Sequence, residues 1–287
     1  MTNFVSDNTL HPSINFINNV YISLNINNKM SIKFGPAGIG AVKDAVGNLE
    51  EFSKLGLKAC EIAFTYGVYI KDENDMKKIK EASRRFGIKL SIHAPYWINL
   101  NSKEKMKIKQ SKERILRCCS AGDKLGADTV VFHPGYYGGM DKEETYQNIK
   151  REILEMIGEI KAQGWDIKLA PETTGKNNVF GSIEEIKKLV DETKCSFTLD
   201  FAHILAREKS VDFEKIKKLF GEFNKWHCHF SGIEYGEKGE KKHVLTSGEK
   251  WRWLLDKLPR DKEIIIINES PDPVGDSVSG LRILGGN

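Results

Sequence analysis

The chain has 287 residues, a net charge of +4 and 40% hydrophobic residues. This length fits either two ordinary domains or one α/β barrel of about 250 residues, and the mildly basic charge permits a phosphate-rich partner but excludes a histone-like polycation. No run of about 18 apolar residues offers a membrane span, so we expect a cytoplasmic protein that contacts no membrane, and no protein partner is indicated.

The cysteines and the N-terminal segment argue against a secreted or disulfide-bonded protein. Five cysteines without a CxxC pair argue against a disulfide framework and against a thiolate zinc site. Residues 1–29 contain eight Asn and no Lys or Arg before Lys29, which excludes the basic start of a secretory signal. We expect residues 1–29 to be a disordered extension, or to precede a true start at Met30, and residues 30–287 to form a single domain.

From Met30 onward, strand-like apolar patterns alternate with helical patterns. The expected strands lie within residues 31–40, 58–64, 88–96, 128–135, 166–172, 196–203, 225–230 and 263–270. The expected helices are 49–55, 72–87, 103–125, 142–163, 183–192, 213–220 and 248–258. This alternation predicts a parallel sheet with helices packed outside it.

Eight such strands favour a (β/α)8 TIM barrel, because eight is the number of parallel strands that closes this barrel. An open doubly wound sheet is the competing fold. It would be expected to carry a GxGxxG phosphate loop after its first strand, and GPAGIG lacks that spacing. Only 18 residues follow Glu269, so we expect a short or rudimentary last helix.

Six of the predicted strands end on a His, Glu or Asp side chain. These residues are His93, His133, Glu172, Asp200, His229 and Glu269, at intervals of 40, 39, 28, 29 and 40 residues. Each interval is close to one βα unit, so the six side chains should converge at the active rim of a barrel. A single histidine is more often a satisfied core or loop residue, but six such strand ends favour a shared site. His203 and His243 follow in the next loops.

This ligand set predicts a divalent-cation site. Imidazoles and carboxylates without thiolates suit Zn²⁺, Mn²⁺ or Fe²⁺. Glu172, which ends the segment DIKLAPE, lies in the middle of the set and can bridge two ions about 3.5–4 Å apart. Such a pair of ions activates water and holds the oxygens of a phosphodiester.

The segments SIHAPYWINL, VVFHPG, LAPETTG, TLDFAH, HCHF and NESP resemble those of the endonuclease IV family of apurinic/apyrimidinic endonucleases, within the xylose-isomerase-like TIM barrels. The resemblance covers residues 31–272, and HAPYWINL and FHPG are its most specific parts. It implies a hydrolase that uses metal-activated water to cleave DNA 5′ to abasic sites.

Carried over residue by residue, the resemblance implies three zinc sites. His93 and His133 would bind a first zinc, and Glu172 would bridge it to a second. The resemblance completes this second site with Asp200, His229 and Glu269. His203 and His243 would serve a third zinc, and Tyr96 matches a tyrosine that the family places near the abasic nucleotide.

The sequence departs from the family at the third site. The family has an Asp-x-His pattern where this chain has Lys241, Lys242 and His243. An ammonium cannot bind a cation, so the third zinc is either lost, weak or completed by Glu240 or water, and Lys241 becomes a candidate contact to the scissile phosphate. The loop TYGVYIKDEN after the second strand is also shorter than the family's DNA-penetrating segment and has no Arg to insert. The Lys-rich GEKGEKKH is consistent with a mobile lid that contacts phosphate, although a solvated run of charges is the more common explanation of such a segment.

Two other functions compete with the endonuclease. One is a sugar isomerase or epimerase of the same superfamily, in which Glu172 or Glu269 moves a proton and one metal polarises a carbonyl. The other is an impaired barrel that only binds metal or nucleic acid. The three strand-end histidines favour a multi-metal phosphodiesterase over a one-metal isomerase.

Overall fold

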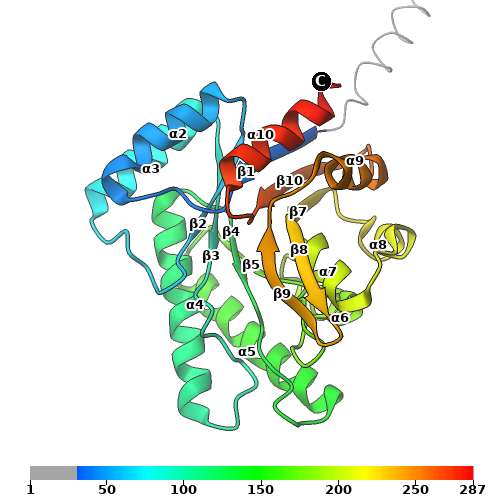
Figure 1. Ribbon diagram of the computed structural model, residues 1–287. Helices are drawn as coiled ribbons and strands as arrows, with labels where there is room; N and C mark the ends of the chain where they lie inside the picture. Colours follow the sequence, from blue (N-terminus) through cyan, green and yellow to red (C-terminus); the bar gives the residue numbers. More distant parts are fainter. Residues whose placement is uncertain (1–30, 287) are drawn as a thin grey trace, which may run out of the picture.

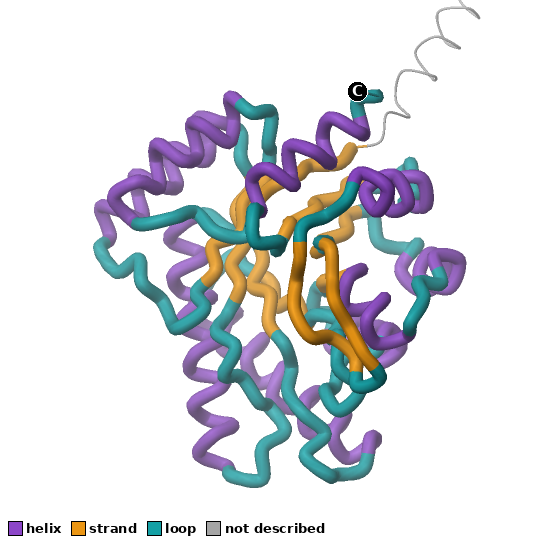
Figure 2. Tube along the Cα trace, viewed as in Figure 1, coloured by secondary structure: helices purple, strands orange, loops and turns teal. Residues whose placement is uncertain are grey.

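Parallel strands line the centre of the computed structural model, which describes residues 31–286, and helices cover their outer side (Figure 1, Figure 2). The prediction for residues 1–29 lies outside the described residues. The barrel strands are β1 (Ser31–Pro36), β2 (Ala59–Ala63), β3 (Lys89–His93), β4 (Thr129–Phe132), β5 (Lys168–Pro171), β6 (Thr198–Asp200), β7 (Lys225–His229) and β10 (Glu263–Asn268). Each one falls within a segment predicted from the alternating pattern.

The eight strands close into a barrel in two halves. One half has the order β1-β10-β7-β6 and the other β2-β3-β4-β5, with parallel pairing throughout. Parallel bridges between Ala37 and Glu61 and between Glu172 and Thr198 join the halves at the two seams. The prediction of a (β/α)8 TIM barrel is therefore confirmed.

The helices follow the strands as expected, with differences at a few ends. They are the 3-10 turn η1 (Val42–Asp44), α2 (Ala45–Lys54), α3 (Glu73–Phe86), α4 (Lys105–Leu125), α5 (Lys142–Gln163), α6 (Ile183–Thr193), α7 (Phe201–Glu208), α8 (Phe213–Phe220), α9 (Gly248–Lys257) and α10 (Pro273–Leu284). The last helix is longer than predicted. Asp272 caps it through the Gly275 amide, Pro273 opens it, and its 12 residues make three full turns.

The predicted sixth strand, 196–203, is split between a strand and a helix. Strand β6 ends at Asp200, whose side chain accepts a hydrogen bond from the His203 amide at 2.7 Å. Asp is a favoured N-cap, so the same carboxylate that ends the strand also starts α7. His203 consequently lies in the first turn of a helix.

The Lys-rich segment after β7 forms an antiparallel hairpin, where a lid-like loop was predicted. Strands β8 (Gly232–Gly236) and β9 (Gly239–Val244) pair with each other in front of the barrel in Figure 1. The Glu240 amide donates to the Gly175 carbonyl at 3.0 Å, which ties the hairpin to the segment after β5. Gly239 has φ +100°, and a Cβ there would lie 2.1 Å from the Gly175 oxygen, so only glycine fits.

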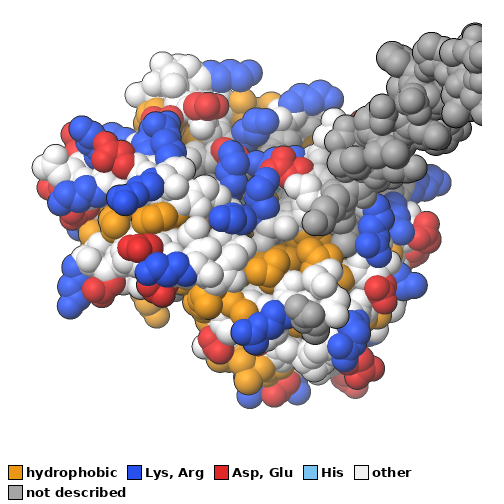
Figure 3. Space-filling view, turned by 90° about the horizontal axis from the view of Figure 1, so that it is seen from above, with side chains coloured by type: hydrophobic (Ala, Val, Ile, Leu, Met, Phe, Trp, Pro, Cys, Tyr) orange, Lys and Arg blue, Asp and Glu red, His pale blue; other side chains and the backbone are white. Residues whose placement is uncertain are grey.

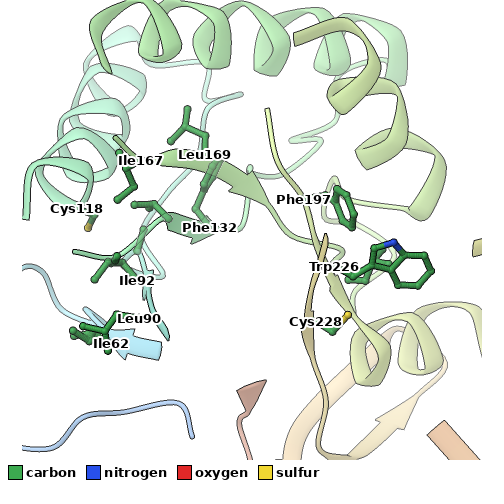
Figure 4. Packing of buried hydrophobic residues seen from close by; sticks show 14 of the residues in the cluster. Ile62, Leu90, Ile92, Cys118, Phe132, Ile167, Leu169, Phe197, Trp226 and Cys228 are labelled. Carbon is green, nitrogen blue, oxygen red and sulfur yellow. The ribbon is translucent and has the colours of Figure 1, made fainter. Parts of the chain in front are cut away.

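The main core lies between the barrel and its helices. Side chains alternate along β7, and Trp226 and Cys228 project outward into this core (Figure 4). His227 and His229 lie on the inner face, where both approach Glu61. Lys and Arg side chains are spread among Asp and Glu over the face in Figure 3. In the described part of the chain, every helix is too short or too polar to cross a bilayer.

Candidate metal centre

Four imidazoles surround the carboxylate of Glu172, which is fully buried just beyond the end of β5. Its Oε2 atom lies 2.9 Å from Nε2 of His133 and 3.3 Å from Nε2 of His93. Its Oε1 atom lies 3.2 Å from Nδ1 of His229 and 3.3 Å from Nδ1 of His203. The structure therefore brings together residues that lie at or just after the ends of β3, β4, β5, β6 and β7.

The strand-end residues form two overlapping sets, in each of which the donor atoms lie within 4.8 Å of one another. The first cluster consists of His93, His133 and Glu172. The second cluster consists of Glu172, Asp200, His229 and Glu269. Glu172 belongs to both, and its two oxygens face different partners. This is the geometry that a carboxylate needs in order to bridge two cations.

Several buried donor atoms in these clusters lack a hydrogen-bond partner and are suited to bind a cation. Among the described residues, Glu172 Oε1, Asp200 Oδ2 and His229 Nδ1 have no partner with hydrogen-bond geometry, although ion-pair distances are short. Buried polar atoms are rarely left in this state, because their desolvation is costly. A divalent cation with imidazole and carboxylate ligands would satisfy them.

A third cluster is formed by His203 from α7 and by Glu240 and His243 from β9. Glu240 Oε2 lies 3.5 Å from His203 Nε2, and Glu240 Oε1 lies 3.9 Å from His243 Nε2. Tyr235 pairs with Glu240 while Glu234 pairs with Lys242, so Lys241 is the extra residue of a β-bulge. The bulge brings Glu240 and His243, three residues apart, to the same cluster. The structure thus supplies the carboxylate that Lys241 cannot.

The clusters open into a cavity of about 560 Å³. Tyr96 lines this cavity with its ring centroid 6.0 Å from that of His93, and its contact to the substrate stays a prediction. Lys241 is exposed on the hairpin and lies outside the set of described residues that line the cavity. Its predicted contact to the substrate phosphate stays a prediction.

Glu61 is the residue of this site that the sequence reasoning missed. It is fully buried on β2, where Ser91 Oγ donates to its Oε2 at 2.7 Å and His227 Nε2 lies 3.0 Å from the same oxygen. Its Oε1 lies 3.1 Å from Nε2 of His229. The one available signal was an acid inside the apolar strand segment CEIA, since a buried carboxylate needs partners.

The sequence signature of the xylose isomerase-like TIM barrel family matches residues 49–284, most of the chain. The chain belongs to this family. A 38% identical relative, an uncharacterized protein of Methanocaldococcus jannaschii, is matched over 86% of this chain and 94% of its own length. An apurinic-apyrimidinic endonuclease of Caenorhabditis elegans is 25% identical over 70% of this chain, which spans about half (54%) of that protein.

Two solved structures share the fold of this chain. Endonuclease IV from Thermus thermophilus superimposes with a TM-score of 0.69 and 21% identity, covering 88% of this chain and 98% of that chain. A D-tagatose 3-epimerase-like protein superimposes with a TM-score of 0.63 at 21% identity, covering 88% and 96%. At this identity the likeness establishes the fold alone.

Ionisation in this xylose isomerase-like barrel is dominated by pairing between imidazoles and carboxylates. Burial alone would lower the pKa of His93, but its hydrogen bond with Glu172 and the attraction of nearby carboxylates raise that pKa to about 9. Burial likewise opposes protonation of His203 and His229. The charge of Asp200 nevertheless raises the pKa of His203 well above its usual range, and the charge of Glu61 does the same for His229. Without a cation, imidazolium groups therefore balance the buried carboxylates.

Cation binding should accordingly release protons at neutral pH. A cation binds neutral imidazole, so the protons held below the raised pKa values must leave. We expect the apparent zinc affinity of the metal-free protein to increase between about pH 6 and pH 8, by about tenfold per pH unit for each displaced proton. Competition with a chelator at several pH values measures this slope. An affinity that does not change with pH would contradict the imidazolium assignment.

Proposed function

We propose that this protein is a metal-dependent phosphodiesterase that cleaves DNA 5′ to abasic sites. One observation carries the proposal: Glu172 is shared by two candidate cation clusters, and a third cluster lies beside them. A relative named as an apurinic-apyrimidinic endonuclease supports the same activity. Zn²⁺ is the cation we propose, with Mn²⁺ or Fe²⁺ as chemically suitable replacements.

Each part of the site would have a separate role in this reaction. The first and second clusters would hold two cations, which when bound would activate water and offset the negative charge of the phosphodiester. Glu172 would fix their separation through its two oxygens. The His93 ring is oriented by a contact between its Nδ1 and the Ala94 carbonyl at 2.8 Å, which leaves Nε2 facing the cluster. Tyr96, at the cavity wall, would contact the abasic nucleotide.

A sugar isomerase or epimerase is the second candidate function. The second cluster alone offers four ligands to one cation, which is sufficient for polarising a carbonyl. The structural likeness to an epimerase-like protein is compatible with this chemistry. In that case the His133 side chain, which belongs only to the first cluster, would be dispensable for turnover.

Incision of a labelled oligonucleotide with a single tetrahydrofuran abasic analogue tests the proposal. We expect the zinc-loaded protein to cut 5′ to the analogue and to leave the matched undamaged duplex intact. His133→Ala should lower the incision rate by about 100-fold or more, because the first cluster loses one of its three ligands. Absence of incision by metal-loaded protein, together with turnover of a keto sugar that survives His133→Ala, would establish the isomerase instead.

The third cluster gives a separate prediction about cation content. If Glu240 completes that cluster, Glu240→Gln should lose one equivalent of zinc relative to the wild type. Lys241→Ala should keep the wild-type content, because Lys241 is exposed and lies outside the cluster, and Lys242→Ala serves as a surface control on the same strand. Elemental analysis after gel filtration measures the ratio. Equal zinc content in Glu240→Gln and the wild type would remove Glu240 from the third site.

A further inference from the structure

The His229 ring stands between two sets of carboxylates inside the barrel. On one side, its Nδ1 lies 3.2 Å from Glu172 Oε1 and 3.6 Å from Glu269 Oε1, both members of the second cluster. On the other side, its Nε2 lies 3.1 Å from Oε1 of Glu61. The ring is fully buried, so neither nitrogen can turn to solvent.

Glu61 is itself held in place by its other oxygen. Oε2 accepts the Ser91 hydroxyl at 2.7 Å and faces His227 Nε2 at 3.0 Å. Its Oε1 and His229 Nε2 lie 3.1 Å apart, and among residues 31–286 neither atom has a partner with hydrogen-bond geometry. Each of these two atoms is therefore the nearest available partner for the other.

We propose that Glu61 is a positioning residue, which accepts the Nε2 proton of His229 and so directs the Nδ1 lone pair at a cation held by the second cluster. An imidazole that binds a metal through one nitrogen usually donates its other N–H to a carboxylate or carbonyl, and this contact fixes both tautomer and ring orientation. The inference rests on the second cluster holding a cation, as in the proposed function.

A competing role for Glu61 is direct coordination. Its carboxylate also lies within a four-residue set with His93, His229 and Glu269. In that set His229 would have to bind through Nε2. The Nδ1 atom would then face Glu172 and Glu269 without a cation between them. The two roles therefore differ in which nitrogen of His229 carries the metal.

Nuclear magnetic resonance of zinc-loaded protein labelled with ¹⁵N-histidine separates these roles. The His229 signals are assigned from the spectrum of His229→Gln. We expect Nε2 of His229 to carry a slowly exchanging proton and Nδ1 to carry the zinc in the wild type. In Glu61→Leu the Nε2 proton of His229 should exchange rapidly with water, because its acceptor has been removed. A wild-type spectrum with zinc on Nε2 would overturn the proposal.

Zinc affinity, measured by chelator competition, provides the second readout. Glu61→Leu should weaken the second cluster's affinity by roughly 10–100-fold, the usual cost of removing such a supporting carboxylate. Glu61→Gln keeps an acceptor oxygen and should lose less. Glu152→Gln, a buried carboxylate on α5 that pairs with Lys112, is the matched control and should behave as the wild type.

The remaining outcomes decide against the proposal. Loss of a whole zinc equivalent in Glu61→Gln would make Glu61 a ligand, and wild-type affinity in Glu61→Leu would give it no role. If the leucine variant does not fold, the wild-type spectrum and the glutamine variant still give the answer. Neither readout involves nucleic acid, so failure here is distinct from failure to incise DNA.

Discussion

Glu172→Gln should reduce incision at the abasic analogue by about three orders of magnitude and remove close to two equivalents of cation. The reason is that Glu172 is the one residue common to the first and second clusters, with an oxygen facing each. A neutral amide offers one weak oxygen ligand where the carboxylate offers two charged ones. Incision kinetics and elemental analysis of the same preparation measure the two effects together.

The control for this substitution is a buried glutamate outside the site. Glu152→Gln on α5 changes the same chemical group at a similarly buried position, so it should keep both cation content and incision. A Glu172→Gln protein with wild-type cation content would remove the bridging role. A variant that loses activity but keeps its cations would show that Glu172 acts on the substrate or on water.

Trp226→Ala should lower the free energy of unfolding by about 3–5 kcal/mol, the usual cost of truncating a large buried aromatic side chain. Trp226 is 1% exposed on the outer face of β7, and its indole donates to the Phe220 carbonyl at 3.2 Å. The same strand carries His227 and His229 on its inner face, so looser packing outside should also weaken cation binding. Urea denaturation with and without zinc measures both effects.

Trp253→Ala is the matched comparison for Trp226→Ala. Trp253 lies on α9, is only partly buried, and packs edge-on against Phe213 with ring centroids 5.1 Å apart. We expect a smaller loss of stability and no change in cation affinity, because α9 carries none of the cluster residues. A loss at Trp226 no greater than that at Trp253 would contradict the packing argument.

Much of the fold could be predicted because its signals are local. Apolar strand segments alternate with helical patterns, and the predicted 142–163 helix coincides with α5. The elements that differ from the prediction depend on local capping or on contacts with distant segments. Helix α7 begins at a cap made by the Asp200 side chain, and a backbone contact to Gly175 holds the β8–β9 hairpin.

The sequence by itself determined the barrel and the set of His, Glu and Asp residues at its strand ends, because period-two alternation and repeated βα spacing require no knowledge of distant contacts. Only the tertiary structure decided which of these residues share a cluster. A bulge at Lys241 brings Glu240 beside His203, and closure of the barrel puts Glu61 of β2 against His229 of β7, far apart in the chain. Such neighbours depend on strand register and ring closure, which no local pattern encodes.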